Sequence, residues 1–256
     1  MSDILLLLIL SVCSYLFGNI NWALIISKIK KTDIRKLGSG NPGTLNMSRN
    51  LGLKAGLLTF FLDIMKGVLP TLTAFFITKD KTFNGTEFVI SDLAIYLAGF
   101  FAVLGHIFPV FLKFKGGKGI ASTIGVFLVC SSVNGWEWAV FVVMALVAAG
   151  VFIYFTEFGA MGSFIAITPP AIGNAIRLFL LYNETKNIYS FAFYILATFL
   201  ILLICLFTWF AHRHNIKRML AGEEHPTSIK EMIVKMKVKK EQEKKEQLSN
   251  QNKKCE

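Results

Sequence analysis

The segment IYSFAFYILATFLILLICLFTWFA, residues 188–211, contains 24 consecutive residues without a charge. A helix needs about 20 mostly apolar residues to cross the hydrocarbon core of a bilayer. A second charge-free run of 24 residues covers Ile4–Ser27. Two such runs in one chain predict a protein whose helices span a membrane.

Five further apolar segments lie between these two runs, in a chain that is 54% hydrophobic and has a mean hydropathy of +0.56. Together the segments predict an all-α polytopic membrane protein with seven transmembrane helices. Six would remain if one of the middle segments does not cross completely. The last of the five, Phe158–Tyr182, is expected to be broken by Pro169, Pro170 and Gly173. The segments are Ala55–Thr78, Leu93–Leu112, Ile120–Trp136, Trp138–Thr156 and Phe158–Tyr182.

Positive charge is distributed unevenly around these segments, and the net charge is +11. If the N-terminus is outside, the loops facing the cytoplasm carry 22 of the 27 Lys and Arg residues, and the opposite loops carry three. Cytoplasmic loops of membrane proteins are enriched in Lys and Arg. We therefore predict a multi-pass protein of the cell membrane with its N-terminus outside and its C-terminus in the cytoplasm. Because topology accounts for the positive charge, nucleic acid is not an expected partner.

The chain divides into a predicted membrane domain, residues 1–225, and a basic cytoplasmic tail, residues 226–256, that is partly disordered or forms a surface helix. Ile229, Met232, Ile233 and Met236 recur at helical spacing among lysines, which suits contact with anionic lipid. A solvated charged tail explains the same composition. Four cysteines without metal-ligand spacing predict neither a disulfide nor a metal site. No cofactor and no obligate protein partner are indicated.

A polar loop follows the first apolar run. Seven of its residues could surround an anion with backbone N–H groups, a hydroxyl, carboxamides and a guanidinium. A tight turn with helix-capping residues is the structural alternative, although such a turn needs only one or two residues of this kind. The candidates are Gly38, Ser39, Gly40, Asn41, Gly43, Asn46 and Arg49.

A second candidate loop reads FKGGKG, residues 114–119, and Pro109 before it is expected to bend or end the preceding helix. Glycines allow close approach of a ligand to backbone N–H groups, and lysines add positive charge, which favours a phosphorylated ligand. A glycine-rich turn with ordinary cytoplasmic lysines is the alternative. The loop is not a Walker A motif, because no Ser or Thr follows its second lysine. The candidates are Lys115, Gly116, Gly117, Lys118 and Gly119.

Two other polar groups stand out. His212 and Asn215 follow the last apolar run and share a face if the helix continues, although polar residues there are often simply interfacial. Asp63 and Lys66 form an (i, i+3) pair inside a span, where isolated charges are costly, and we interpret them as a structural pair. His106, near the end of another span, is interpreted as a packed structural residue.

Five motifs, taken in order, resemble those of the bacterial acyl-phosphate:glycerol-3-phosphate acyltransferases. One glycine motif would be a weak signal, but five in order, extending over about residues 15–225, are specific. The motifs are GSGNPG at residues 38–43 with Asn46 and Arg49, FLDIMKG at 61–67, GHIFPVF at 105–111, FKGGKGIAS at 114–122, and His212 with Asn215, Arg218, Gly222 and Glu224.

This resemblance implies a seven-helix fold with its active site at the cytoplasmic membrane face. It implies transfer of a fatty acyl group from acyl phosphate to the sn-1 hydroxyl of glycerol 3-phosphate, giving lysophosphatidic acid and phosphate, with the acyl chain among membrane lipids. The first loop and the glycine-rich loop would bind substrate. The implied catalytic residues are Ser39, Arg49, Lys118, His212 and Asn215.

Some positions depart from the family pattern. The usual Gly-Ala-Thr-Asn is here GTLN at residues 43–46, and a small Ser that usually follows Gly18 is Asn19. The segment TEFGA at residues 156–160 lacks the serine that usually precedes Leu-Gly. The resemblance therefore assigns no role to a serine in this segment.

An acyl phosphate is already activated, so we expect direct attack by the glycerol 3-phosphate hydroxyl, with Arg49, Lys118 and backbone N–H groups neutralising two anions. The proton could pass to the leaving phosphate or to His212 as general base. Two other classes stay open, a transporter of phosphate or a small organophosphate and a non-catalytic lipid-binding protein. Transporter sites lie near the membrane midplane, whereas these motifs gather on one face.

Overall fold

The computed structural model describes residues 2–83, 89–133, 135–184, 190–224, 226–227, 234 and 238. These residues form α-helices joined by loops and short 3-10 turns, with one isolated bridge between Thr82 and Val89 and no strand. The predicted all-α fold is confirmed. The helices are α1 (Asp3–Gly18), α2 (Trp22–Ile29), α3 (Thr44–Leu51), α4 (Leu53–Thr78), α5 (Ser91–Ile107), α6 (Ile120–Ser132), α7 (Trp136–Thr156), α8 (Gly159–Glu184), α9 (Phe191–Ala211) and α10 (Arg213–Leu220).

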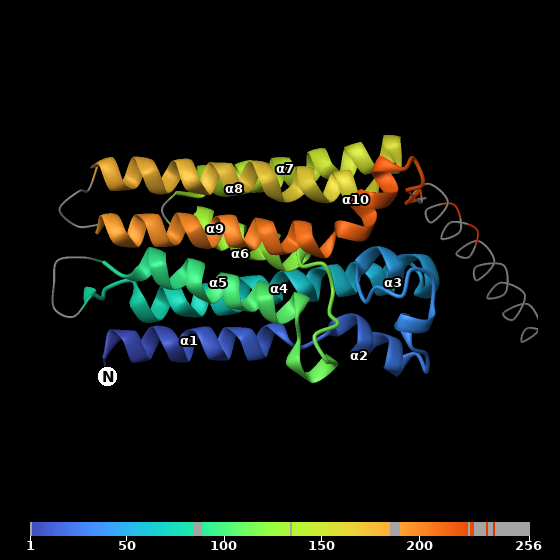
Figure 1. The fold of residues 1–256 in the computed structure, drawn as a ribbon, viewed down its shortest axis with the longest axis horizontal. Helices are drawn as coiled ribbons and strands as arrows, with labels where there is room; N and C mark the ends of the chain where they lie inside the picture. Colours follow the sequence, from blue (N-terminus) through green and yellow to red (C-terminus); the bar gives the residue numbers. More distant parts are fainter. Residues whose placement is uncertain are drawn as a thin grey trace, which may run out of the picture.

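The long helices lie side by side along the long axis of the molecule, and the short helices α2, α3 and α10 gather at one end (Figure 1). The N-terminus lies at the opposite end (Figure 1). The closest neighbours include α1 with α5, α4 with α5 and α6, and α7 with α8. The bundle therefore has one end that collects irregular and polar segments, which are also the segments that carry the sequence motifs.

Six helical segments in the described residues are long and apolar enough to cross a membrane, and one of them, Asp3–Ile29, consists of α1 and α2 together. α6 is apolar but has only 13 residues, about 20 Å of helix at 1.5 Å per residue, which is less than the hydrocarbon thickness of about 30 Å. Exposed apolar side chains such as Leu8 and Leu202 cover the outside of the bundle, as expected for helices in contact with lipid. The protein is a multi-pass integral membrane protein.

The first apolar run is two helices instead of one. α1 ends at Gly18, and α2 begins at Trp22. The Asn21 side chain accounts for the break, because it accepts a hydrogen bond from the Leu24 N–H at 3.0 Å and caps α2. The predicted first span is present, since Asp3–Ile29 is long and apolar enough to cross a membrane, but it consists of two helices.

The predicted break in the segment 158–182 is wrong. α8 continues from Gly159 to Glu184 with Pro169 and Pro170 inside it. Transmembrane helices tolerate proline, since neighbouring polar side chains and small backbone adjustments can satisfy the freed backbone groups. The Asn174 side chain adds a further hydrogen bond in this part of the helix, since its Nδ2 donates to the Pro170 carbonyl at 2.9 Å.

Pro109 ends α5 as predicted, because that helix stops at Ile107. The next predicted span, over residues 120–136, is shorter in the structure, since α6 ends at Ser132. α7 already begins at Trp136. The last residues of the apolar segment therefore belong to the connection between α6 and α7, although their hydropathy had predicted them to be part of the span.

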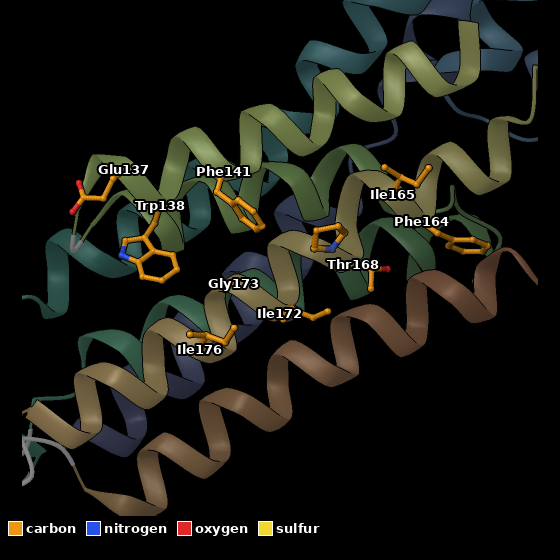
Figure 2. A pocket seen from close by; sticks show the side chains of 10 residues that line it. Glu137, Trp138, Phe141, Phe164, Ile165, Thr168, Ile172, Gly173 and Ile176 are labelled. Carbon is orange, nitrogen blue, oxygen red and sulfur yellow. The ribbon is translucent and has the colours of Figure 1, made fainter. Parts of the chain in front are cut away.

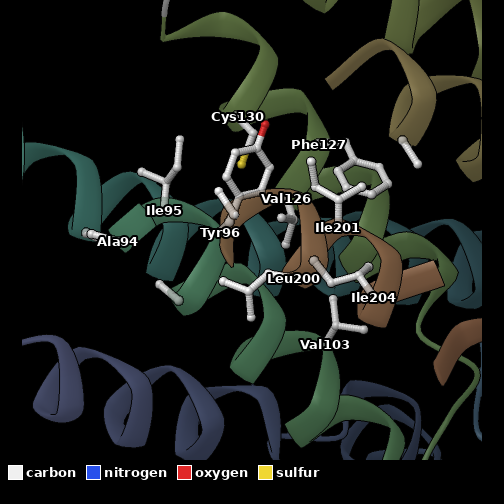
Figure 3. Close-up of a cluster of buried hydrophobic side chains, with 14 of the residues drawn as sticks. Ala94, Ile95, Tyr96, Val103, Val126, Phe127, Cys130, Leu200, Ile201 and Ile204 are labelled. Carbon is white, nitrogen blue, oxygen red and sulfur yellow. The ribbon is translucent and has the colours of Figure 1, made fainter. Parts of the chain in front are cut away.

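Close packing between α4 and α6 depends on glycine. A Cβ atom added to Gly67 would lie 2.0 Å from the Ser122 carbonyl oxygen, and one added to Gly125 would lie 2.2 Å from the Ile64 carbonyl oxygen. Small residues let transmembrane helices approach in this way. The apolar core lies beside this contact, where side chains of α5, α6 and α9 meet (Figure 3); it includes Ile95, Tyr96, Val103, Phe127, Leu200, Ile201 and Ile204.

A buried polar network joins α5, α6 and α8 at the end of the bundle that lies away from α10 (Figure 1). The Arg177 guanidinium is 2.8 Å from the Asp92 carboxylate. The Tyr96 hydroxyl donates to Asn174 Oδ1 at 2.7 Å, and Asn174 Nδ2 donates to Ser131 Oγ at 3.0 Å. Charges inside a membrane are costly unless they are paired, so this network fastens three helices together in lipid.

Candidate active site

A chain of polar contacts crosses the α10 end of the bundle. The Lys118 ammonium, just before α6, donates to Asn215 Oδ1 on α10. Asn215 Nδ2 donates to Glu224 Oε1 at 2.8 Å, and Arg218 Nε donates to Glu224 Oε2 at 3.2 Å. The Glu224 side chain is only 5% exposed. These contacts connect the glycine-rich loop to the segment after the last span, two regions that are almost 100 residues apart.

Lys118 is half-buried, and its surroundings change its proton affinity. Burial lowers the pKa of its ammonium to about 8. The Glu224 carboxylate opposes this shift, whereas the positive charges of Arg218 and Arg49 add to it. A lysine in such surroundings remains mostly charged at neutral pH. It can therefore attract an anion, and the two arginines make the whole cluster more cationic.

His212 is buried at the end of α9, with 1% of its surface exposed. Its Nδ1 donates to the Thr208 carbonyl at 2.9 Å, since a carbonyl oxygen can only accept. Burial and, to a smaller extent, the nearby Lys118 charge lower the pKa of the imidazole to about 4, and the Thr208 contact opposes the shift. The ring is therefore neutral at pH 7, and its Nε2 carries a free lone pair that can accept a proton.

Arg49, on α3, approaches the same cluster from another side. Its guanidinium contributes to the low pKa of Lys118, and its Nη2 donates to the Pro226 carbonyl at 3.2 Å. The next residue, Thr227, is 1% exposed. Its N–H donates to the Glu157 carbonyl at 2.8 Å, at the corner between α7 and α8. The chain after α10 is thus fastened to the body of the protein at both α3 and the α7–α8 corner.

Asn46 organises the first loop instead of facing the Lys118 cluster. Its Nδ2 donates to the carbonyls of Ile34 and Leu37 at 3.3 and 3.0 Å. Its Oδ1 accepts the Ser39 N–H at 3.1 Å and Asn50 Nδ2 at 3.0 Å. The side chain is 3% exposed. Every polar group of Asn46 is therefore used to hold the loop closed.

Replacing Asn46 by leucine is expected to destabilise the protein by roughly 2–4 kcal/mol, because two carbonyls and one N–H lose their buried partner. The melting temperature in detergent should fall accordingly. Asn50→Leu, which removes a more exposed side chain one turn further along α3, serves as the matched control and should have a smaller effect. Equal melting temperatures for the Asn46 variant and the wild type would contradict this role.

The glycine-rich loop uses two of its N–H groups internally. Gly116 N–H donates to the Ile107 carbonyl and Gly117 N–H to the His106 carbonyl, both at 3.1 Å. These two N–H groups, which were candidates for binding phosphate, therefore cap α5. Gly119 has φ +84 and is the N-cap residue of α6. The N–H groups of the first turn of a helix have no partner within that helix, so the start of α6 is the part of this loop that can still receive an anion.

The structure brings four of the five predicted catalytic residues to one place: Arg49, Lys118, His212 and Asn215. The fifth, Ser39, is exposed, and the contacts described for it stay within its own loop. The predicted substrate-binding residues Gly38, Gly40, Asn41 and Gly43 lie in that same loop, and the Lys115 side chain is exposed.

Arg218 and Glu224 complete the polar chain, although the sequence prediction gave neither of them a site role. Arg218 lies three residues after Asn215 on α10, so both side chains share a helix face. Gly222 has φ +72 and turns the chain back toward α10, which allows Glu224 to contact both residues. The helical spacing could have indicated Arg218, but only the turn decides where Glu224 lies. Within the described residues no three His, Cys, Asp or Glu side chains gather as a metal site.

A bundle of membrane-length helices with a cationic, histidine-containing site at one end defines an integral membrane protein that can act on anionic substrates. A model of the glycerol-3-phosphate acyltransferase family matches residues 8–222. The chain belongs to this family, which confirms the resemblance seen in the sequence motifs and places the protein in phospholipid biosynthesis.

Known relatives agree over nearly the whole chain. Glycerol-3-phosphate acyltransferase of Mycoplasmopsis pulmonis is 37% identical over 231 residues, covering 88% of this chain and 96% of the relative. The Aquifex aeolicus protein of the same name is 35% identical, covering 85% and 97%. The crystal structure of PlsY, an integral membrane glycerol 3-phosphate acyltransferase, in its glycerol 3-phosphate form is 30% identical with a TM-score of 0.68, covering 89% of this chain and 98% of that chain.

Proposed function

We propose that this protein transfers a fatty acyl group from acyl phosphate to the sn-1 hydroxyl of glycerol 3-phosphate and releases lysophosphatidic acid and inorganic phosphate. The observation that carries the proposal is the proximity of Lys118 to His212. One supplies positive charge, and the other supplies a neutral proton acceptor. Acyl transfer between two anionic substrates needs both functions. A structure of PlsY with glycerol 3-phosphate supports the choice of acceptor.

The cationic side chains of the site can offset the negative charge of the two substrates. Each substrate carries a phosphoryl group, and two such groups repel one another unless positive charge lies between or beside them. Lys118, Arg49 and Arg218 supply three cations against one carboxylate, Glu224. Asn215 holds the Lys118 ammonium by a hydrogen bond. In this proposal the lysine neutralises the charge that develops on the acyl carbonyl oxygen and on the leaving phosphate.

The neutral imidazole of His212 can accept the proton that the attacking hydroxyl must lose. His212 Nδ1 donates to the Thr208 carbonyl, which leaves Nε2 as the basic atom. In this proposal Nε2 accepts the proton of the attacking hydroxyl while the carbon–oxygen bond to the acyl carbonyl forms and the bond to the phosphate breaks. Because acyl phosphate is an activated mixed anhydride, the reaction needs no acyl-enzyme intermediate.

An apolar groove supports a long-chain acyl donor. It has a volume of about 860 Å³ and runs along α7 and α8 (Figure 2). Phe164 lies at one end of the groove, and its ring packs 5.3 Å from the His212 ring. Ile172 and Ile176, farther along α8, are 57% and 48% exposed and open the groove toward lipid. An acyl chain lying here would end beside the proposed proton acceptor.

Narrowing this groove should change the preference for acyl-chain length. Ile172→Trp is expected to lower kcat/KM for a 16-carbon acyl phosphate about tenfold, since a blocked hydrophobic pocket loses about 1–3 kcal/mol per group excluded. The value for an 8-carbon donor should stay within about twofold. Leu8→Trp, on the lipid-facing side of α1, is the matched control and should alter neither value. An equal loss for both donors would contradict the assignment of the groove.

The proposal includes a topology of seven passes, made by α1, α4, α5, α6, α7, α8 and α9, with the N-terminus outside. Helix order and the asymmetry of Lys and Arg support it. In this topology the α10 end faces the cytoplasm, where soluble glycerol 3-phosphate and the acyl donor are available. A C-terminal tag that a protease removes from intact cells would contradict the orientation.

The decisive experiment uses the purified full-length protein in lipid nanodiscs with radiolabelled glycerol 3-phosphate. Palmitoyl phosphate should give labelled lysophosphatidic acid with one phosphate released per product, whereas palmitoyl-CoA should give none. Product only from palmitoyl-CoA would overturn the donor assignment. Counterflow of glycerol 3-phosphate across sealed vesicles without acylation would instead support the transporter alternative.

A further inference from the structure

Three buried polar side chains lie directly beneath the glycine-rich loop. Asp63 and Lys66, on α4, and His106, on α5, are 3%, 1% and 4% exposed. The Lys66 ammonium is 3.0 Å from the Asp63 carboxylate and 3.1 Å from His106 Nδ1. His106 Nδ1 is also 3.8 Å from the Asp63 carboxylate. These contacts fix both the position and the rotation of the imidazole ring.

The glycine-rich loop packs directly against the His106 ring. A Cβ atom added to Gly117 would lie 2.2 Å from His106 Nε2 and 2.9 Å from its Cε1. The His106 carbonyl also accepts the Gly117 N–H at 3.1 Å. His106 therefore contacts Gly117 through both its ring and its backbone, and the next residue in the chain is Lys118.

We propose that His106, held in place by Lys66 and Asp63, is a positioning residue. Its ring contacts Gly117, fixes the position of the loop backbone there and thereby places the Lys118 ammonium in the anion site. This inference rests on the proposed function, since it assigns a task within the same acyl transfer. The buried ion pair then serves more than helix packing: it orients the ring that supports the loop. Displacing a reacting group by about 1 Å can cost about 100-fold in rate, so such support matters for catalysis.

The two glycines of the loop give a sharp test, because their substitutions meet different atoms. Alanine at position 117 would meet the His106 ring, whereas alanine at position 116 would meet the His106 carbonyl oxygen, at 2.0 Å. Neither glycine has a positive φ, so backbone strain does not distinguish them. Removing the ring should make room for the first substitution and leave the second as harmful as before.

We expect Gly117→Ala alone to lower kcat/KM for glycerol 3-phosphate about 100-fold. In a His106→Ala background the same substitution should cause no further loss, while Gly116→Ala should be equally damaging in both backgrounds. Independent losses that multiply in the His106→Ala, Gly117→Ala double variant would overturn the proposal. An inactive wild-type protein would instead overturn the proposed function, so the two failures can be distinguished.

The pH dependence gives a second readout that a purely structural residue would not move. Glu224, Arg218, Arg49 and His212 are the charged or titratable groups that act on the Lys118 ammonium. If the His106 ring no longer supports the glycine-rich loop, the Lys118 ammonium should become more hydrated and its pKa should rise. The pH above which kcat/KM falls should then move upward from about 8.

Two further variants make this readout decisive. Asp63→Leu combined with Lys66→Met removes both buried charges together and leaves the His106 ring without these partners. This double variant should move the alkaline limit of kcat/KM upward as well, and it provides the test if His106→Ala does not fold. Arg177→Met disrupts the buried pair at the other end of the bundle and should lower the melting temperature without moving the limit. An unchanged limit in the charge-free variant, or an equal movement in Arg177→Met, would contradict the proposal.

Discussion

Lys118→Met is expected to lower kcat/KM for acyl transfer by about 10²–10³-fold, the usual cost of removing one preorganised group that stabilises charge in the transition state. Methionine keeps an unbranched apolar stem of similar length in the half-buried site, so the loss reports the charge more than the packing. The variant also leaves Asn215 Oδ1 without its donor. Product formation from palmitoyl phosphate and labelled glycerol 3-phosphate measures the effect.

The same lysine gives the reaction a defined alkaline limit. Burial lowers its pKa from 10.5 to about 8, so the charged form is present below that pH and is lost above it. Activity measured as kcat/KM, which reports the free enzyme, should therefore fall about tenfold per pH unit above pH 8. The folded state binds fewer protons than the unfolded state between pH 8 and 10.5, so the contribution of this lysine makes the free energy of unfolding rise with pH across that interval. Loss of activity there does not reflect unfolding caused by this lysine.

Two variants separate charge from position. Lys118→Arg keeps a cation that cannot lose its proton in this range, so it should retain some activity and lose the alkaline limb. Lys113→Met removes an exposed lysine a few residues earlier and should change kcat/KM by less than about threefold. Wild-type turnover in Lys118→Met would remove this residue from the mechanism.

His212→Gln is expected to lower kcat by about 10²–10⁴-fold with little change in KM, the cost typical of losing a positioned general base. Glutamine can keep a hydrogen bond to the Thr208 carbonyl, but it cannot accept a proton at neutral pH. In the wild type the imidazole is neutral above the His212 pKa of about 4, and the ammonium is charged below the Lys118 pKa of about 8, so both groups are in the required form between these pH values. Steady-state kinetics of the purified variant give kcat and KM separately.

His214→Gln is the matched control, because this neighbouring histidine is exposed on α10. Its kcat should equal that of the wild type. A fully active His212→Gln variant would mean that the leaving phosphate takes the proton, and His212 would then be a packing residue against Phe164.

The sequence predicted the site through residue types more than through geometry. Gly116, Gly117 and Lys118 are all in the predicted loop, yet the glycine N–H groups cap α5, and only the lysine side chain joins the cluster. Sequence cannot distinguish these uses, because a glycine N–H that binds an anion and one that caps a helix have the same local pattern. Asn46 is a similar case, since it was predicted to bind substrate and its side-chain hydrogen bonds in the structure lie within its own loop.

Hydropathy and charge along the chain determined that this is an all-α membrane protein, because the bilayer demands long apolar helices and leaves little other choice. The motif order determined the family. Tertiary structure decided which polar groups work together: Lys118 meets Asn215 across 97 residues, and Asp63, Lys66 and His106 meet beneath Gly117. Helix packing sets these contacts, and packing depends on close approaches such as Gly67 against Ser122 that no local pattern records.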